Sequence, residues 1–439
     1  MPVSTGASAE EHLVAMSQDT AAFPTLSGFD PLGQEFLSNP APIIKRAQAE
    51  APVFYYPELR MWVVTRYDDI CRAARDWETF SSRATGCVPP PDDLKHKIPD
   101  DFIDNHFISL DPPEHTADRR ALTRPFLPGE LRKQEENIRR IANALIDQFI
   151  DRGHCDFMQE FCYPLSLNVI MGLLGVPPER AEDYRIWTED LFCVLAPKTK
   201  DSVTKPMSEE ERRERWTRLA ESQAFFESFV AERLRCPVND LTSEILQAKD
   251  ADGNPAIPAS RVVRKLHELV AAGNDTTANL MGLMLLQLGE HPEWDREVRS
   301  NPSLLSNVVE ETLRLRGTSP GLFRITTREV ELGGAKIPEG SLVWLLYIGG
   351  GLDESHFPQS ETWDIHRPNR DKHLAFGHGR HTCIGNPLAR LEARVAFEEL
   401  FKRIPDIRVT QGQKVEFLPV LTVTTMNHLQ AEWTLAQGR

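Results

Sequence analysis

The stretch Phe376-Gly377-His378-Gly379-Arg380-His381-Thr382-Cys383-Ile384-Gly385 decides how the rest of the chain is interpreted. Gly377 and Gly379 accept a positive φ without steric cost, so the stretch predicts a tightly folded loop. A helix from Asn386 to about Arg403 is expected to follow. The unpaired N–H groups and the dipole at its start favour a thiolate at Cys383. The cysteine is therefore predicted to act as a ligand rather than to pack in a core.

The composition describes an acidic protein. The chain has 439 residues and a formal net charge of −15, which argues against non-specific binding to nucleic acid or to an anionic membrane. It has no signal-peptide pattern and no run of about 18 apolar residues that would span a bilayer. Its seven cysteines form no CxxC pair, so neither a disulfide framework nor a structural zinc site is expected. We expect a cytoplasmic protein, with residues 1–24 as a flexible N-terminal tail.

Apolar residues at three- and four-residue spacing predict a mainly α protein with minor β (α+β). The strongest pattern, Ala259–Glu290, is apolar on most faces and predicts a long buried helix. Alternating patterns predict small antiparallel sheets and hairpins at 53–66, 325–347 and 415–433, and 84–105 is expected to be a loop. Because no βαβ alternation is visible, a single domain over 25–439 is expected. Further helices are predicted at 42–50, 67–75, 111–123, 130–151, 161–174, 178–195, 209–234 and 303–316.

A polar step interrupts the long buried helix at Ala272-Gly273-Asn274-Asp275-Thr276-Thr277. Gly273 costs about 1 kcal/mol of helix stability relative to Ala, so its presence in a helix interior needs an explanation. A ligand groove beside the helix or a locally opened helix would explain it. Thr276 would then hydrogen-bond the ligand, and Asp275 would relay protons. The alternative is a satisfied polar pair that bends the helix.

Two further pairs are weak signals by themselves. His115 and Arg119 lie four residues apart on one helix face, which suits either carboxylate binding or an ordinary solvated cationic face. Glu311 and Arg314 have the spacing of a common helical ion pair. Neither pair establishes a function alone.

In this order and at these separations, the motifs resemble those of the cytochrome P-450 superfamily, haem-thiolate monooxygenases of the soluble bacterial type. Phe376-Gly377-x-Gly379-x-His381-x-Cys383-x-Gly385 resembles the haem-binding loop, and Ala272 to Thr277 resembles the oxygen-activating motif. Glu311-Thr312-Leu313-Arg314 resembles the Glu-x-x-Arg motif, and Asp111-Pro112-Pro113-Glu114-His115 resembles the start of the helix that leads onto the haem. The resemblance runs from about Pro40 to the end of the chain.

The resemblance implies a triangular prism of about a dozen helices with small antiparallel sheets, holding haem b (iron protoporphyrin IX). Cys383 would be the axial thiolate ligand of the iron. Asp275 and Thr276 would act in oxygen activation and proton delivery. The cationic donors to the haem propionates would be His115, Arg119, Arg324 and His381. Further contacts to the haem would come from Ala272, Phe376 and Gly385.

The resemblance also assigns structural and substrate-binding roles. Glu311, Arg314 and Arg367 would form a buried network. An apolar pocket, expected for a small to medium hydrophobic substrate such as a terpenoid, a steroid or an aromatic compound, would draw on Leu269, Val270, Leu322, Phe323 and Leu421. One departure is Gly350-Gly351-Leu352-Asp353-Glu354, where many relatives have Ala-Asn-Arg-Asp-Pro.

The implied activity inserts one atom of O₂ into the substrate, by hydroxylation or dealkylation. The chain ends at Arg439 without a reductase segment, so a separate ferredoxin and ferredoxin reductase, with NAD(P)H as the ultimate donor, are expected as partners. Arg370, Lys372 and Arg380 would form the docking patch or an ordinary charged surface. We expect a monomer that binds neither nucleic acid nor a membrane. The alternatives are a peroxygenase, a non-catalytic haem-binding gas or ligand sensor, and a zinc or redox-cysteine protein.

Overall fold

The computed structural model describes residues 23–104, 106–197 and 207–435. The predicted N-terminal tail therefore lies almost wholly outside the described residues. The helices are α2 (Gln34–Ser38), α3 (Ala41–Glu50), α4 (Tyr67–Arg75), α5 (Glu114–Thr123), α6 (Pro128–Leu131), α7 (Gln134–Ile146), α8 (Tyr163–Leu174), α9 (Ala181–Val194), α10 (Glu209–Arg235), α11 (Leu241–Gln247), α12 (Ala259–Glu290), α13 (Pro292–Ser300), α14 (Leu305–Arg316), α15 (Tyr347–Gly351) and α16 (Asn386–Arg403).

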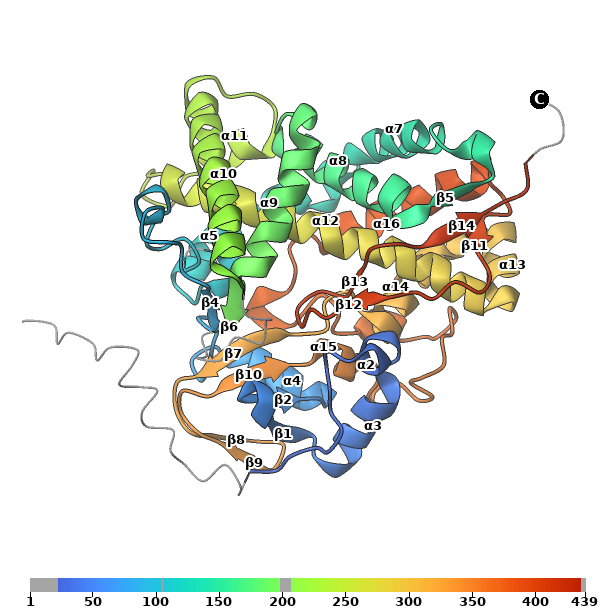
Figure 1. Cartoon of the computed structure of the whole chain (residues 1–439), viewed down its shortest axis with the longest axis horizontal. Helices are drawn as coiled ribbons and strands as arrows, with labels where there is room; N and C mark the ends of the chain where they lie inside the picture. The colour runs from blue at the N-terminus through green and yellow to red at the C-terminus, as the bar shows by residue number, and fades with distance from the viewer. Residues whose placement is uncertain (1–22, 105, 198–206, 436–439) are drawn as a thin grey trace, which may run out of the picture.

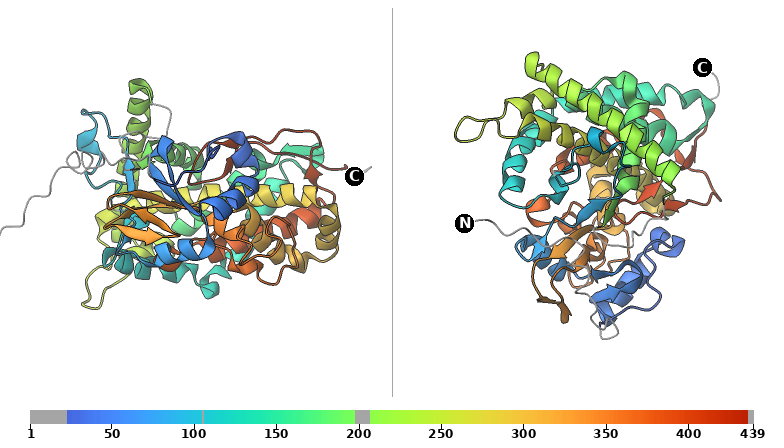
Figure 2. Two further views of the ribbon diagram at one scale, coloured as in Figure 1. Left: turned by 90° about the horizontal axis from the view of Figure 1, so that it is seen from below. Right: turned by 60° about the vertical axis from the view of Figure 1, so that its left-hand side comes forward.

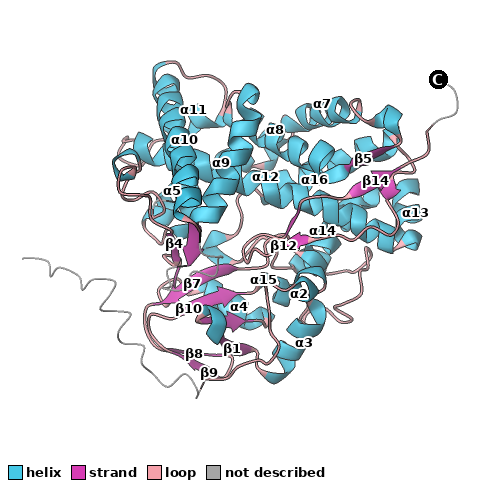
Figure 3. Ribbon diagram, viewed as in Figure 1, coloured by secondary structure: helices cyan, strands magenta, loops and turns pink. Residues whose placement is uncertain are grey.

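The strands are short. They are β1 (Val53–Tyr56), β2 (Met61–Val64), β3 (Phe80–Ser81), β4 (Thr85–Cys87), β5 (His154–Asp156), β6 (Leu195–Pro197), β7 (Leu322–Thr326), β8 (Val330–Leu332), β9 (Ala335–Ile337), β10 (Leu342–Leu345), β11 (Arg408–Val409), β12 (Phe417–Leu418), β13 (Thr425–Met426) and β14 (Gln430–Glu432). Helices dominate one part of the molecule, and the largest sheet lies with α3 and α4 in the other (Figure 3).

Helix α12 runs through the middle of the helical part, as its apolar pattern predicts (Figure 1). Helices α8, α10, α14 and α16 all pack against it. The two rotated views show the same helix enclosed by its neighbours (Figure 2). A helix that is apolar on most faces has to be covered on most faces, and this requirement places α12 at the centre.

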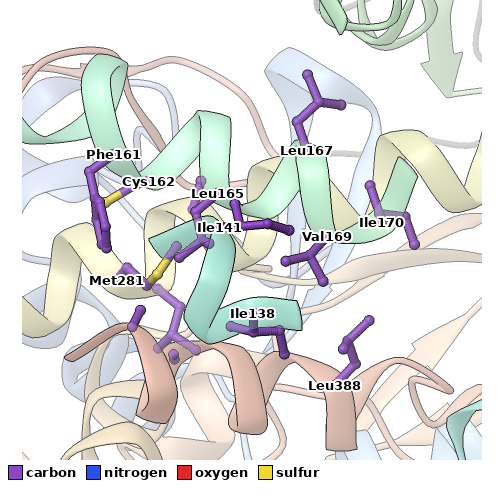
Figure 4. Close-up of a cluster of buried hydrophobic side chains, with 14 of the residues drawn as sticks. Ile138, Ile141, Phe161, Cys162, Leu165, Leu167, Val169, Ile170, Met281 and Leu388 are labelled. Atoms are coloured by element: carbon purple, nitrogen blue, oxygen red, sulfur yellow. The ribbon is translucent and has the colours of Figure 1, made fainter. Parts of the chain in front are cut away.

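The principal core lies where α7, α8, α12 and α16 meet (Figure 4). Ile138 of α7, Ile170 of α8, Met281 of α12 and Leu388 of α16 all belong to it and are buried. The predicted helix at 161–174 begins earlier, as a π-helical turn at Met158–Cys162. Because Pro164 has no N–H to donate, the regular α pattern is interrupted at this join.

The largest sheet has the order β1-β2-β10-β7-β3. Its outer hairpin, β1 with β2, is antiparallel as predicted. However, β10 pairs with β2 in parallel, with Val343 opposite Trp62, so the sheet is mixed and not purely antiparallel. The predicted hairpin at 415–433 is wrong in its extent. Strand β12 pairs with β13, whereas β14 leaves the hairpin and joins β11 and β5 in a separate sheet.

Other local differences concern short elements. The expected loop at 84–105 contains β4, which pairs with β6 at the end of α9. The predicted helix at 130–151 is divided between α6 and α7, and helices α11 and α13 had not been predicted. None of the described helices is long and apolar enough to cross a membrane.

Candidate functional site

The cysteine loop is closed by its own backbone. The Cys383 N–H donates to the Phe376 carbonyl at 2.8 Å, and the Asn386 side chain donates to the Cys383 carbonyl at 2.5 Å. Gly377 and Gly379 adopt φ values of +71° and +72°. A Cβ on Gly379 would lie 2.7 Å from a backbone oxygen of α4, so only glycine fits there. The loop conformation is therefore as predicted.

Burial raises the pKa of the Cys383 thiol above its ordinary value. The N–H groups of Gly385 and Asn386, together with Arg119, act to lower this pKa, but the effect of burial is larger. The backbone N–H groups thus favour the thiolate, as predicted, whereas desolvation favours the thiol. A ligated cation would be needed to deprotonate the sulfur. Protein surrounds the Cys383 side chain on all sides, but no atoms pack directly against all of it. The side chain therefore faces open space inside the molecule and is not packed in the core.

Arg119 braces the same loop from α5. Its Nη1 donates to the carbonyl of Arg380 at 3.0 Å and to that of Thr382. Phe376 packs beneath the loop, with the guanidinium of Arg390 4.5 Å from its ring centroid. The cysteine is thus held by contacts from α5 and α16 as well as by its own turn.

His115, His381 and Arg324 converge beside the cysteine loop. The imidazole centroids lie 4.1 Å apart, and Arg324 reaches the same place from β7. Burial and the neighbouring arginines lower the pKa of His115 to about 4 and that of His381 to about 2. Both rings are neutral at pH 7 and would donate N–H rather than charge. The expected set of four cations is reduced to Arg119 and Arg324.

Two buried donors in this group have no hydrogen-bond partner in the described part of the chain. They are Nε2 of His115 and Nη2 of Arg324. An unpaired buried donor is costly, so a ligand with anionic acceptors would satisfy both. The haem propionates have this chemistry. The donor set and the accessible Cys383 therefore fit haem.

Helix α12 remains continuous through the polar step. Thr276 Oγ1 donates to the Ala272 carbonyl at 2.7 Å, so the hydroxyl is satisfied within its own helix. Ala272 itself is exposed although it lies on a central helix. A Cβ on Gly273 would lie 3.0 Å from Ile170 of α8. The close packing of the two helices explains the glycine, and no turn of α12 is opened there.

Asp275 is half-buried next to this step. Burial raises its pKa to about 6, with a smaller contribution from Glu189, whereas Arg185 acts in the opposite direction. Its side chain accepts a hydrogen bond from Asn274 at 3.3 Å, and its carbonyl accepts one from Asn279 at 2.8 Å. A carboxyl group with a pKa near neutrality both gains and loses a proton readily, which suits proton transfer.

Glu311, Arg314 and Arg367 meet in one buried network. Arg314 binds both carboxylate oxygens of Glu311, at 2.8 and 2.9 Å, and Arg367 Nε lies 3.1 Å from Oε1 of Glu311. Arg314 also donates to the Gly351 carbonyl at 2.6 Å. The network joins α14 to the segment that leads to the cysteine loop.

The unusual 350–354 segment has a steric explanation. A Cβ on Gly351 would lie 2.1 Å from the Arg314 carbonyl oxygen, and one on Gly350 would lie 2.5 Å from Leu374. A side chain at either position would not fit this backbone. The close approach allows Gly351 to accept the hydrogen bond from Arg314.

The five predicted pocket residues are divided among three apolar clusters. Leu269 and Val270 of α12 belong to the principal core, and Phe323 packs with Leu421 in a second cluster. Leu322 packs against a third. The structure does not bring the five together in one cluster.

Sequence reasoning missed Ser82, Asp111 and Glu310. Ser82 Oγ lies 2.9 Å from Nε2 of His381, and Asp111 accepts the Ser82 N–H at 2.9 Å. Glu310 binds Arg390, which covers Phe376. Only Asp111 belonged to a quoted motif. The other two had no local signal, because their partners lie far away in the sequence.

Metal ligation by clustered side chains is absent from the described ranges. No group of three or more His, Cys, Asp or Glu side chains in 23–104, 106–197 or 207–435 could hold a metal ion. Each of the seven cysteines is free. Cys383 is a candidate ligand because of its own loop and its accessibility.

Comparisons with known proteins agree with this site. A family model described as Cytochrome P450 matches residues 53–405. The chain is 34% identical over 383 residues to the putative cytochrome P450 YjiB of Bacillus subtilis (strain 168), across 86% of this chain and 90% of that protein. The structure of cytochrome P450 CYP109Q5 from Chondromyces apiculatus is 32% identical, with a TM-score of 0.80, over 93% of this chain and 99% of that one. Full-length CYP116B46 from Tepidiphilus thermophilus is 28% identical, with a TM-score of 0.83, over 94% of this chain and 54% of that one.

Proposed function

The chain belongs to the cytochrome P450 family and is a haem-thiolate monooxygenase; from this premise, we propose that it oxidises a small to medium hydrophobic substrate with electrons from a separate ferredoxin. The observation that carries the proposal is the accessible Cys383 in a loop whose helix, α16, packs against the α12 helix of Asp275 and Thr276. We propose haem b as the cofactor. Bound haem would supply the activation of O₂, with Cys383 as the protein ligand to its iron.

The remaining tasks fall to the side chains of this protein. We assign His115, Arg119, Arg324 and His381 to the haem propionates. The unpaired donors on His115 and Arg324 support this assignment. Ala272, Phe376 and Gly385 would contact the haem. Gly385 lies beside the sulfur, and its N–H hydrogen-bonds the Cys383 side chain and lowers the thiol pKa. The Glu311, Arg314 and Arg367 network would hold the segment before the cysteine loop in place.

Asp275 is assigned to proton transfer and Thr276 to oxygen activation. With its pKa near 6, Asp275 holds its proton in a fraction of the molecules at neutral pH and releases it easily. The Thr276 hydroxyl donates to the Ala272 carbonyl and keeps its lone pairs available to accept from a neighbour. The two side chains are consecutive on α12 and would act as one unit.

A hydrophobic substrate is supported by the residues of the predicted pocket, which are all apolar. We propose Leu269, Val270, Leu322, Phe323 and Leu421 as its walls, each contributed by one of the three separate apolar clusters. Oxygenation of such a substrate by hydroxylation or dealkylation would make it more polar.

We propose that the electron donor docks on the surface beside the cysteine loop. Arg72 and Arg75 line a surface groove that also contains Asp68 and Asp76, and Arg380 is exposed next to it. In a chain of net charge −15, these three arginines are the groups we propose to meet an acidic ferredoxin. Arg370 is not available for docking, because its guanidinium donates to the Arg367 carbonyl and to Asn307.

We further propose a monomer with a single haem domain over 25–439. We also propose a cytoplasmic location, which the free cysteines support.

The test begins with a screen of small hydrophobic compounds for a shift in the spin state of the ferric protein. The best compound is then turned over with NAD(P)H, a bacterial ferredoxin and its reductase. Thr276→Ala should keep haem and compound binding but divert NAD(P)H consumption into hydrogen peroxide, because the hydroxyl no longer assists oxygen activation. An unchanged ratio of product to NAD(P)H in the variant would refute the role of Thr276. The absence of oxygenated product for every shifting compound would refute the proposed activity.

A further inference from the structure

A second buried ionic cluster, separate from the Glu311 network, joins α5 to α12. Asp118 and Lys265 are both completely buried, with Lys265 Nζ 2.9 Å from Asp118 Oδ2. Arg261, one turn before Lys265 on α12, lies 2.7 Å from the same carboxylate oxygen. Lysine and aspartate are almost never fully buried unless they are paired, and removing both from water is costly. Removing either partner would leave an uncompensated buried charge.

Glu268 extends the cluster to the segment 106–110. Its two carboxylate oxygens accept the N–H groups of Phe107 at 2.5 Å and Ile108 at 2.8 Å. Lys265 lies 5.8 Å from the centroid of the Phe107 ring and favours the charged form of Glu268, whereas burial raises the pKa of this carboxyl group. Hydrogen bonds to a carboxylate are among the stronger ones in proteins. Glu268 therefore ties this segment to α12 at two consecutive residues.

The segment held by Glu268 contacts the donors assigned to the haem. The Phe107 ring stacks on His115 with a centroid distance of 4.6 Å and an interplanar angle of 17°. Asp118 lies on α5 between His115 and Arg119. On α12, Glu268 precedes Ala272 by four residues and Thr276 by eight, so the three lie along one face. One cluster thus links the propionate donors to the helix assigned to oxygen activation.

We propose that Asp118, Lys265 and Glu268 form a positioning network that holds α5 and the segment 106–110 against α12 and thereby sets the place of His115 at the haem edge. None of the three touches the reacting atoms. Their action passes through the Phe107 stack and through α5. The proposal rests on the proposed binding of haem at this site and adds the residues that orient its donors.

The principal test uses Glu268→Gln in the haem-bound enzyme. The amide keeps the size of the side chain but loses one acceptor and the charge, so it cannot accept both N–H groups. We expect the amide hydrogens of Phe107 and Ile108 to exchange at least about tenfold faster, with haem content unchanged. Haem transfer to apomyoglobin should accelerate several-fold, and the propionate bending bands in the resonance Raman spectrum should shift. Glu290→Gln, at an exposed glutamate on the same helix, is the matched control and should change none of these.

A loss of stability alone has to be separated from a positioning role. Thr242→Ala on α11 removes a buried hydrogen bond to the Leu174 carbonyl and supplies a destabilised reference. At a comparable loss of melting temperature, this reference should leave the Raman bands unshifted. Lys265→Met should reproduce the Raman shift of Glu268→Gln, because it removes the charge between Asp118 and Glu268.

Two results would overturn the proposal. One is unchanged exchange at Phe107 and Ile108 in Glu268→Gln, which would mean that the carboxylate does not hold the segment. The other is faster exchange with unaltered Raman bands and haem transfer, which would mean that the segment does not position the donors. None of these measurements needs turnover. A failure of the proposed oxygenation would therefore be recognised separately, by the absence of product.

Discussion

Replacing Asp275 with Asn should stabilise the protein at neutral and alkaline pH while impairing its catalysis. Burial and Glu189 raise the pKa of Asp275 from 3.8 to about 6. The folded protein therefore binds this proton more tightly than the unfolded chain does. Below about pH 3 the carboxyl group is protonated in both states, and folding carries no penalty. Above about pH 6 it is ionised in both states, and the full cost of holding a buried charge lowers the free energy of unfolding.

The size of the effect follows from this difference. A rise from 3.8 to about 6 corresponds to about 3 kcal/mol at 1.36 kcal/mol per pH unit. Because the side chain is only half-buried, solvent screening reduces the expected gain to about 1–2 kcal/mol. For 439 residues the unfolding entropy is about 0.9 kcal/mol/K, so the melting temperature of Asp275→Asn should exceed that of the wild type by about 1–2 °C at pH 8.

The assay compares melting temperatures of the ferric haem-bound proteins from pH 4 to pH 8. The advantage of the variant should be smallest at pH 4, grow through pH 5–6 and level off above that. In parallel, product formation should fall at least about tenfold, because Asn cannot relay a proton. Asp252→Asn, at an exposed aspartate, is the matched control. An advantage that does not depend on pH, or a variant less stable than the wild type at pH 8, would refute the reasoning about burial.

Three further outcomes are expected. Cys383→Ala should abolish the thiolate-type absorption of the reduced carbonyl complex, and survival of that band would show that another group ligates the iron. Arg314→Ala should lower the free energy of unfolding by about 3–5 kcal/mol in denaturant titrations, since it breaks the buried pair with Glu311; a loss below about 1 kcal/mol would contradict a structural role. Gly273→Ala should destabilise the protein by at most about 2 kcal/mol, because a Cβ pressing on Ile170 costs about 1–3 kcal/mol and the higher helix propensity of Ala offsets about 1 kcal/mol of it; the double variant with Ile170→Val should recover part of the loss, and an equal loss in both would place the cause elsewhere.

Features encoded in consecutive residues were well predicted. Helices α12 and α16 have the predicted bounds, because the hydrogen bonds of a helix and its apolar spacing are local. The conformation of the cysteine loop was predicted for the same reason, since Gly377 and Gly379 act within their own turn. The sequence did not predict how the five pocket residues are grouped, because their grouping depends on how distant segments pack in the folded chain.

Charge states depend on burial, which a local stretch of sequence does not report. The helix start was predicted to favour the thiolate of Cys383, and its N–H groups do so, but desolvation outweighs them and raises the pKa. His115 and His381 were expected to be cations, and burial makes them neutral. Desolvation depends on every segment that covers a side chain, and a single stretch of sequence does not contain that information.

By itself, the sequence determined the family motifs, the long buried helix and Cys383 as the candidate ligand, because each is written in residues that are neighbours along the chain. The tertiary structure alone decided the parallel pairing of β10 with β2, the packing reason for Gly273, and the cluster of Asp118 with Lys265. Each of these joins residues separated by about a hundred positions or more, and only the folded chain brings such residues within contact or hydrogen-bond distance.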